Sequence, residues 1–346
     1  MYSNLHSDPG RRHPIMSQQR LIWIDLAKGI GISLVVIGHA GRGLMSAAIP
    51  DEMQVLPLLD GAIYAFHMPL FFILSGVTIG LRPIASIQPD LSRRIWRIFY
   101  PLIIWTYLFL AMRAVAGVHA NTQVSWHALL TLPLPPVAHF WFLWALLLNV
   151  ASFAVVRIFF RPLVSDVLFW AFAVFVSGAV SSIVHFSSSM APWFGAALGY
   201  SVAFALGGLI GASQLREAVP SRGAAIVAAL LFAFALWLAI HSKTAAWTIV
   251  IGCLLSLLLL LPLAWLSAKF GQSLVVRAVA FLGTISLAIY VMHTMFSAAV
   301  RIGLIVFGID NLAVHFVLGV VAGVLGPLLA YVVARRLGVL GAVGLV

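Results

Sequence analysis

The sequence predicts an all-α, polytopic integral membrane protein with about ten transmembrane helices and both termini in the cytoplasm. Of its 346 residues, 63% are hydrophobic and only 8% are charged, whereas a soluble domain carries about 25% charged residues. Apolar runs of about 20 residues, the length needed to cross a bilayer, recur along the chain. Basic residues lie mostly between these runs and strongly favour one side, as orientation signals do.

The predicted spans are separated by polar stretches or by stretches that contain Pro and Gly. They cover residues 21–43, 57–81, 98–117, 138–159, 167–186, 193–213, 223–241, 245–267, 279–301 and 312–334. Residues 1–20 are polar and basic and are predicted to form a cytoplasmic N-terminal tail. Residues 21–340 are predicted to form a single transmembrane domain.

The basic residues support this topology. With the N-terminus in the cytoplasm, fifteen of them fall on the inner side: Arg11, Arg12, Arg20, Arg82, Arg93, Arg94, Arg97, Arg157, Arg161, Arg216, Arg222, Lys269, Arg277, Arg335 and Arg336. Four fall on the outer side: Arg42, Arg113, Lys243 and Arg301. Because a miscounted helix would mix the two sets, the bias favours ten helices. The net charge of +11 therefore reflects topology, and we expect no nucleic-acid partner. The lone cysteine, Cys253, excludes a disulfide framework.

The first span is unusual because it carries Asp25, Lys28 and His39. Ionisable groups at membrane depth are costly and are kept mainly where they line a cavity or meet a substrate. Lys28 and His39 are three helical turns apart on one face, separated by about 16 Å along the axis. Asp25 lies one turn before Lys28 and either offsets its charge or is solvated at the interface. This face could serve a site that is reached from both sides of the bilayer.

The second span contains the sequence AFHMPLFFILSG, with His67 in its outer half and Ser75 and Gly76 in its inner half. These residues have a structural interpretation too. Pro69 is a tolerated kink, Ser75 bonds to its own backbone, and the Ser-Gly pair permits close helix approach.

Arg94 and Arg97 lie in RRIWRIFYP, on the cytoplasmic approach to the third span. Three residues apart, they share a helix face at the membrane surface. They can serve as a topology signal or a contact to anionic lipid. They can also form a clamp for phosphate groups, because guanidinium groups match phosphate oxygens.

Further titratable residues occur in two later spans. His139 opens the fourth span in HFWFLWALL, where an aromatic interfacial belt is also expected. Tyr290 and His293 share a face of the ninth span in GTISLAIYVMHT. Neither a His-x-x-x-His pair nor acidic pairing accompanies these histidines, so we expect no metal site.

In order, DLAKGIGISLVVIGHA, FHMPLFFILSG, RRIWRIFYP, HFWFLWALL and SLAIYVMHT resemble the membrane acyltransferase 3 family, and most closely its stand-alone sugar O-acetylases of the fucose O-acetylase-like branch. The resemblance covers about residues 20–340. It implies transfer of an acyl group, usually acetyl from cytoplasmic acetyl-CoA, to a carbohydrate or glycolipid hydroxyl at a bacterial inner membrane. The family motif of a basic residue, ten spacers and His matches Lys28 and His39, with Lys where many members have Arg. The paired-arginine motif matches Arg94 and Arg97.

These considerations give a division of labour across the membrane. A sugar hydroxyl needs a general base that titrates near neutrality, and we expect His39 to be that base, with Lys28 and Asp25 completing the catalytic set. Binding of the donor or acceptor is expected to involve Arg94, Arg97, Ser75, His67, His139, Tyr290 and His293. The sequence leaves open whether transfer is direct or passes through an acyl-His or acyl-Ser intermediate.

Two other function classes stay open. A transporter or flippase for a carbohydrate or lipid-linked sugar would also carry polar residues within its helices. A structural subunit of a polysaccharide export complex would leave Lys28 and His39 without a role. Acetyl-CoA consumption distinguishes the transferase from both.

Overall fold

The structure is a computed structural model that describes residues 21–82, 91–130, 134, 136–160, 164–185, 191–241 and 248–345. The predicted N-terminal tail lies outside these ranges. Across them the chain is helical and contains no β-strand. This is the architecture expected in lipid, where every backbone hydrogen bond must be satisfied internally.

The helices follow one another along the chain with short connections. They are α1 (Ile22–Ser46), α2 (Val55–Tyr64), α3 (His67–Gly80), α5 (Leu91–Ala116), η2 (Gly117–His119), η3 (Trp126–Leu130), η4 (Ala138–Phe140), α6 (Trp141–Phe160), α7 (Asp166–His185), η6 (Ala191–Gly195), α8 (Ala196–Ala212), η7 (Gln214–Glu217), α9 (Arg222–His241), α10 (Thr248–Phe270), α11 (Leu274–Thr284), α12 (Ser286–Val306) and α13 (Leu312–Arg336).

The prediction of about ten membrane spans is confirmed: within the described ranges, ten helical segments are long and apolar enough to cross a bilayer. Two of the first eight spans differ from those predicted, and one boundary is not described. The second span is broken at Phe66 into α2 and α3. The third span begins at Leu91, not residue 98, so the paired arginines lie inside α5. The predicted start of the eighth span, at residue 245, lies outside the described residues.

The predicted ninth span, 279–301, was wrong at its start. It is divided at Ile285 into α11 and α12, and only α12 is long enough to span. The side chain of Ser273 caps α11 by accepting a hydrogen bond from the Val276 amide at 3.3 Å. With eleven residues, α11 is about 16 Å long, roughly half the hydrocarbon thickness. Hydrophobicity continues through the break, so a hydropathy pattern does not reveal it.

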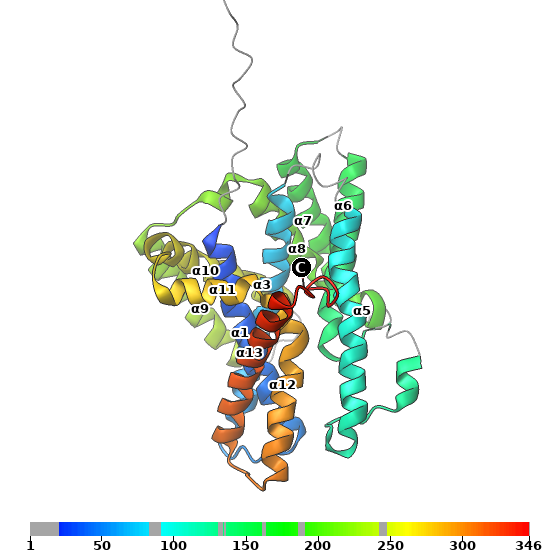
Figure 1. Cartoon of the computed structure of the whole chain (residues 1–346). Helices are drawn as coiled ribbons and strands as arrows, with labels where there is room; N and C mark the ends of the chain where they lie inside the picture. Colours follow the sequence, from blue (N-terminus) through cyan, green and yellow to red (C-terminus); the bar gives the residue numbers. More distant parts are fainter. Residues whose placement is uncertain are drawn as a thin grey trace, which may run out of the picture.

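Helix α1 occupies the centre of the bundle and packs against α2, α3, α10, α11, α12 and α13. Figure 1 shows α5 and α6 at one edge of the bundle and α9, α10 and α11 at the opposite edge. We call the end of the bundle where α1 begins the near side, and the end where α1 stops the far side. The C-terminal segment after α13 returns to α5, where the Trp105 indole donates a hydrogen bond to the Val343 carbonyl at 2.9 Å.

Glycines permit close contact between α3 and α8. A Cβ atom at Gly76 would collide with the backbone of Phe204, and one at Gly207 would collide with the backbone of Ile73. The structural interpretation of Gly76 in the sequence motif is therefore correct. Small residues of this kind let membrane helices approach closely without a side chain between their backbones.

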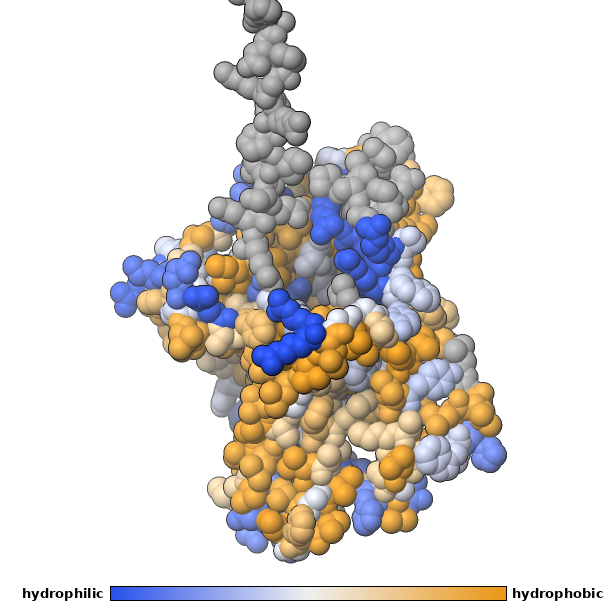
Figure 2. Space-filling view, viewed as in Figure 1, coloured by the Kyte–Doolittle hydropathy of each residue, from blue (hydrophilic) through white to orange (hydrophobic). Residues whose placement is uncertain are grey.

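The outer surface of the bundle is apolar. Large hydrophobic side chains are exposed along α9 and α13, including Leu230, Phe234, Val317, Val321 and Leu329. In Figure 2 apolar side chains cover most of the visible lower body, while hydrophilic ones gather where α13 ends. A surface of this extent suits contact with lipid rather than water. The chain is an integral membrane protein.

Candidate functional site

Three histidines from distant parts of the chain meet inside the bundle. His39 comes from α1, His139 from η4 and His293 from α12. Their ring centroids are separated by 5.7 Å for His39 and His139, 5.1 Å for His39 and His293, and 5.2 Å for His139 and His293. The fold thus gathers into one group, here called the histidine cluster, three residues that the sequence predicted separately.

The Nε2 atoms of the histidine cluster are available for chemistry. All three are buried and make no hydrogen bond to the described part of the chain. For His293, Nδ1 lies 2.7 Å from the Tyr290 carbonyl and 3.1 Å from the Ile289 carbonyl. Since a carbonyl only accepts, Nδ1 carries the proton, and in the neutral ring Nε2 is then a free acceptor. The backbone of α12 fixes this tautomer.

Tyr290 holds the cluster from one side. Its hydroxyl donates a hydrogen bond to the backbone carbonyl of His139, which ties α12 to the short helix η4. The Tyr290 ring centroid lies 5.3 Å from that of His139 and 6.2 Å from that of His293. Because Tyr290 is 5% exposed, its hydroxyl needs a partner inside the protein, and His139 supplies it.

A large cavity reaches the histidine cluster from the far side. This far cavity has a volume of about 540 Å³, and its lining includes His39 and His139. The rest of its lining comes from α1, α2, α5, η4, α6, α12, α13 and the connection after η2. The polar and charged members are Arg42, Ser46, Tyr64, Arg113, Asn121, Thr122, Thr294, Ser297, Arg301 and His315. A volume of this size is in the range that holds a small ligand.

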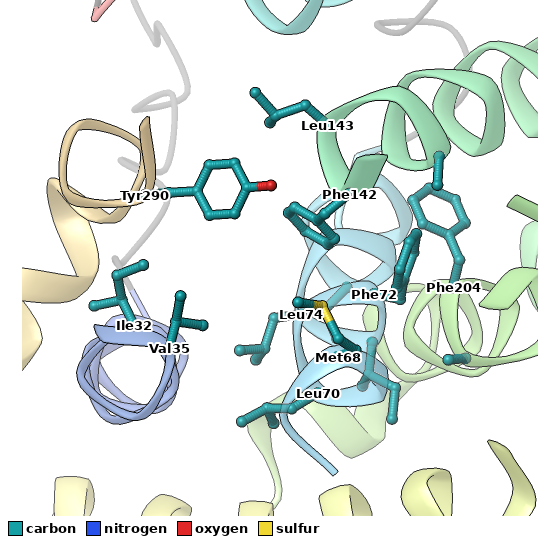
Figure 3. Packing of buried hydrophobic residues seen from close by; sticks show 14 of the residues in the cluster. Ile32, Val35, Met68, Leu70, Phe72, Leu74, Phe142, Leu143, Phe204 and Tyr290 are labelled. Carbon is teal, nitrogen blue, oxygen red and sulfur yellow. The ribbon is translucent and has the colours of Figure 1, made fainter. Parts of the chain in front are cut away.

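A smaller cavity lies toward the near side. This near cavity has a volume of about 130 Å³, and its polar lining residues are Lys28, Ser75, Ser286 and Tyr290. Figure 3 shows Tyr290 pointing from α12 toward Phe142 of α6, while Ile32 and Val35 point from α1 into the same space. Tyr290 lines the near cavity and His139 lines the far cavity, so the contact between these two rings is where the cavities approach each other.

Helix α1 therefore contributes to both cavities from one face. Lys28, Ile32 and Val35 line the near cavity, and His39 lines the far cavity. The position of α1 is set by a glycine contact with α11. A Cβ atom at Gly29 would collide with the carbonyl of Val279, and one at Gly283 would collide with the carbonyl of Asp25. The i, i+4, i+7, i+11 spacing keeps Lys28 and His39 on a single face, as predicted.

His293 lines neither cavity, and four further predicted site residues also lie outside both. His67 is 1% exposed, and its Nδ1 lies 2.7 Å from the Ile63 carbonyl. Asp25 stands on α1 one turn before Lys28. Arg94 and Arg97 lie in the first two turns of α5 at the near side, where Arg97 is exposed and Arg94 is half-buried. Their assignments stay predictions.

The structure adds site residues that the sequence analysis missed. Arg42, Arg113 and Arg301 had been interpreted only as topological signals, and Thr294 was not singled out. His315 was not singled out either, yet it is 1% exposed and lines the far cavity. One signal was present in the sequence: these arginines are on the side where the topology rule makes basic residues rare.

Within the described ranges, no group of three or more His, Cys, Asp or Glu side chains is arranged to hold a metal ion. The arrangement is suited to proton transfer, since His39 and His139, whose Nε2 atoms are unoccupied, line the far cavity.

Sequence comparisons relate the chain to known proteins. The sequence model of an acyltransferase domain family matches residues 21–332. Nodulation protein NolL of Sinorhizobium fredii is 33% identical over 144 residues, and NolL of Mesorhizobium japonicum is 29% identical over 146 residues. These matches cover 41% and 42% of this chain but only 37% of each NolL protein.

A longer match is found with an Escherichia coli protein. Inner membrane protein YcfT is 28% identical over 311 residues, which is 80% of this chain and 79% of YcfT. No solved structure matches the chain. The family model covers nearly the whole set of membrane helices, including all three members of the histidine cluster. This chain belongs to the membrane acyltransferase 3 family.

Proposed function

We propose that the protein transfers an acetyl group from cytoplasmic acetyl-CoA to a hydroxyl of a carbohydrate or glycolipid at the bacterial inner membrane. The observation that carries the proposal is that two cavities approach each other beside the histidine cluster. His39 and His139 line the far cavity, and Tyr290, which contacts His139, lines the near cavity. This geometry lets a donor and an acceptor approach one base without either crossing the membrane.

The near side is assigned to the cytoplasm. The excess of basic residues at this end supports that orientation, and the description of YcfT as an inner membrane protein supports the location. The near cavity is too small for a whole coenzyme A. It would take the acyl thioester end, while the phosphates stay outside, near Arg94 and Arg97 at the start of α5. Lys28 contributes a positive charge to the wall of the near cavity.

The acceptor hydroxyl is assigned to the far cavity beside His39. In the proposed step, His39 Nε2 takes the hydroxyl proton as the oxygen attacks the thioester carbonyl. The carbon–sulfur bond then breaks, an ester forms, and the coenzyme leaves as a thiolate that takes up a proton. His139 and His293 lie against His39 and can hold its ring in place or pass the proton onward. A covalent acyl-enzyme alternative stays open.

Isotope-labelled acetyl-CoA provides the test. The full-length protein in lipid nanodiscs is incubated with [¹³C]acetyl-CoA and a glycan and glycolipid extract of the host envelope. Free coenzyme A is measured, and labelled esters are sought by mass spectrometry. The proposal predicts coenzyme A release together with a labelled carbohydrate ester. A parallel assay uses the protein reconstituted into proteoliposomes. A transporter would move a sugar across their membrane without coenzyme A release, and that result would overturn the proposal.

A further inference from the structure

The far cavity gathers three arginines where the topology rule makes basic residues rare. Sequence analysis left four basic residues on this side, and three of them, Arg42, Arg113 and Arg301, line this one cavity. The fourth, Lys243, lies outside the described residues. They come from three helices, α1, α5 and α12. Arginines that were on the far side for unrelated reasons would not be expected to line one cavity. Their convergence therefore points to a shared ligand.

Arg301 is the most deeply placed of the three. It is 9% exposed, and its Nε atom makes no hydrogen bond to the described residues. One of its terminal nitrogens lies against Gly43, where a Cβ atom would collide with it. The lack of a side chain at Gly43 thus leaves room for the guanidinium beside α1. A buried guanidinium without a partner is costly, and an anion in the cavity would relieve that cost.

The charge of the cavity is only partly balanced from within the protein. Arg42 forms a two-pronged ion pair with Asp60, at 2.6 Å and 3.0 Å, and lies over the Tyr64 ring. Arg113 contacts the face of Phe109, and no ion pair to it is found in the described part of the chain. No Asp or Glu is among the residues that line the cavity. Two positive charges therefore face the cavity without an internal counter-charge.

Other buried polar atoms in the same wall also lack partners. Thr294 Oγ1 and His315 Nδ1 make no hydrogen bond to the described residues, and both side chains line the cavity. The cavity thus offers a hydroxyl and an imidazole nitrogen next to the arginines. That combination suits a ligand with hydroxyl groups and an anionic group, and a neutral apolar ligand would leave these atoms unsatisfied.

We infer that the acceptor held in the far cavity is an anionic glycan, which presents a carboxylate or a phosphate to Arg301 and Arg113. This inference rests on the proposed function only in so far as it calls the bound glycan the acceptor. The binding preference for an anionic sugar exists whether or not acyl transfer occurs, and this separates the two in an experiment.

Binding of three matched probes tests the inference. The full-length protein, in nanodiscs of zwitterionic phosphatidylcholine that keep lipid anions away, is titrated with methyl glucuronide, glucose 1-phosphate and methyl glucoside. Either charged probe should bind about 10-fold or more tightly than the neutral one, as expected for hydrogen bonds to a charged group. A preference for the glucuronide or for the phosphate identifies which anion the acceptor carries. Equal binding of all three probes would overturn the inference.

Variants locate the preference in the cavity. Arg301→Gln and Arg113→Gln should each reduce the charged-to-neutral preference several-fold, while Arg301→Lys should retain part of it. Arg335→Gln, at the opposite end of α13, removes the same charge outside the cavity and should leave the preference unchanged. If Arg301→Gln does not fold, the wild-type comparison and Arg113→Gln still decide. Acylation of neutral sugars without any preference would reject the anionic acceptor but keep the transferase, whereas absence of coenzyme A release would reject the transferase alone.

Discussion

The near and far cavities, which approach each other where Tyr290 contacts His139, differ in size and in charge. The near cavity, of about 130 Å³, has an apolar wall with a single basic residue, Lys28. The far cavity, of about 540 Å³, has three arginines and three histidines in its wall. A narrow apolar passage favours a slender group such as an acyl thioester arm, and a wide polar one favours a hydroxylated ligand that needs many hydrogen bonds. Under the proposed function, this difference assigns the donor to the near cavity and the acceptor to the far cavity.

The largest expected effect is at the junction of the cavities. His39→Ala and His39→Gln should each lower acyl transfer by at least about 100-fold, since general-base catalysis contributes about 10²–10⁴ in rate. Release of coenzyme A from [¹³C]acetyl-CoA, normalised to protein in the membrane, measures the effect. His119→Gln is the control, because His119 is exposed in the turn after α5. Substantial transfer by either His39 variant would remove this residue as the base.

The second prediction concerns the charge of the near cavity. Lys28→Arg should keep part of the activity, while Lys28→Met should lose most of it, because a positive charge along the near cavity favours the anionic donor. Steady-state kinetics with acetyl-CoA as the varied substrate separate the two variants. Lys269→Met, an exposed change at the end of α10, serves as the control. Equal rates for the Met and Lys proteins would show that the near cavity needs no charge.

The third prediction concerns the hydrogen bond from the Tyr290 hydroxyl to the His139 carbonyl, which connects the walls of the two cavities. Tyr290→Phe leaves the His139 carbonyl without its donor, at a cost of about 1–3 kcal/mol for an unsatisfied buried group. As a positioning residue, Tyr290 should affect kcat and change neither KM much. We expect Tyr290→Phe to lower kcat by roughly 3- to 10-fold, less than the full energy range implies, because the protein partly relaxes around the unsatisfied carbonyl. Tyr331→Phe on α13 is the matched control, because its hydroxyl makes no hydrogen bond to the described residues. A change confined to the KM of acetyl-CoA would instead place the Tyr290 hydroxyl on the donor.

The smallest effect is expected at the mouth of the near side. Arg94→Ala and Arg97→Ala should raise the KM for acetyl-CoA by a few-fold and leave the KM for the acceptor unchanged, since an exposed phosphate contact mainly affects binding. High salt should reproduce part of this effect, because screening acts over about 8–10 Å at ordinary ionic strength. Arg277→Ala, exposed on α11, is the control. Altered acceptor preference, or cysteine labelling of position 94 or 97 from outside the cell, would contradict the two-sided arrangement.

The fold could be predicted from the sequence to a large extent. Span number, span order and the shared face of Lys28 and His39 follow from hydrophobic length and helical period, which are local properties of the chain. The broken span at Ile285 and the early start of α5 could not be predicted in the same way. A short apolar helix such as α11 has the composition of a membrane span, and only the tertiary structure shows it as a separate helix packed against α1.

The sequence by itself determined that the chain crosses the membrane about ten times, that it carries the family motifs, and that His39, His139 and His293 are unusual residues for such helices. Only the tertiary structure decided that these three imidazoles meet, although they lie about 100 and 150 residues apart along the chain. It also decided that Arg42, Arg113 and Arg301, which a charge count treats as exceptions to topology, line one cavity. The physical reason is that hydropathy and periodicity report which face of a single helix is polar. Which polar faces come together depends on close contacts between helices, here the glycine contacts of α1 with α11 and of α3 with α8.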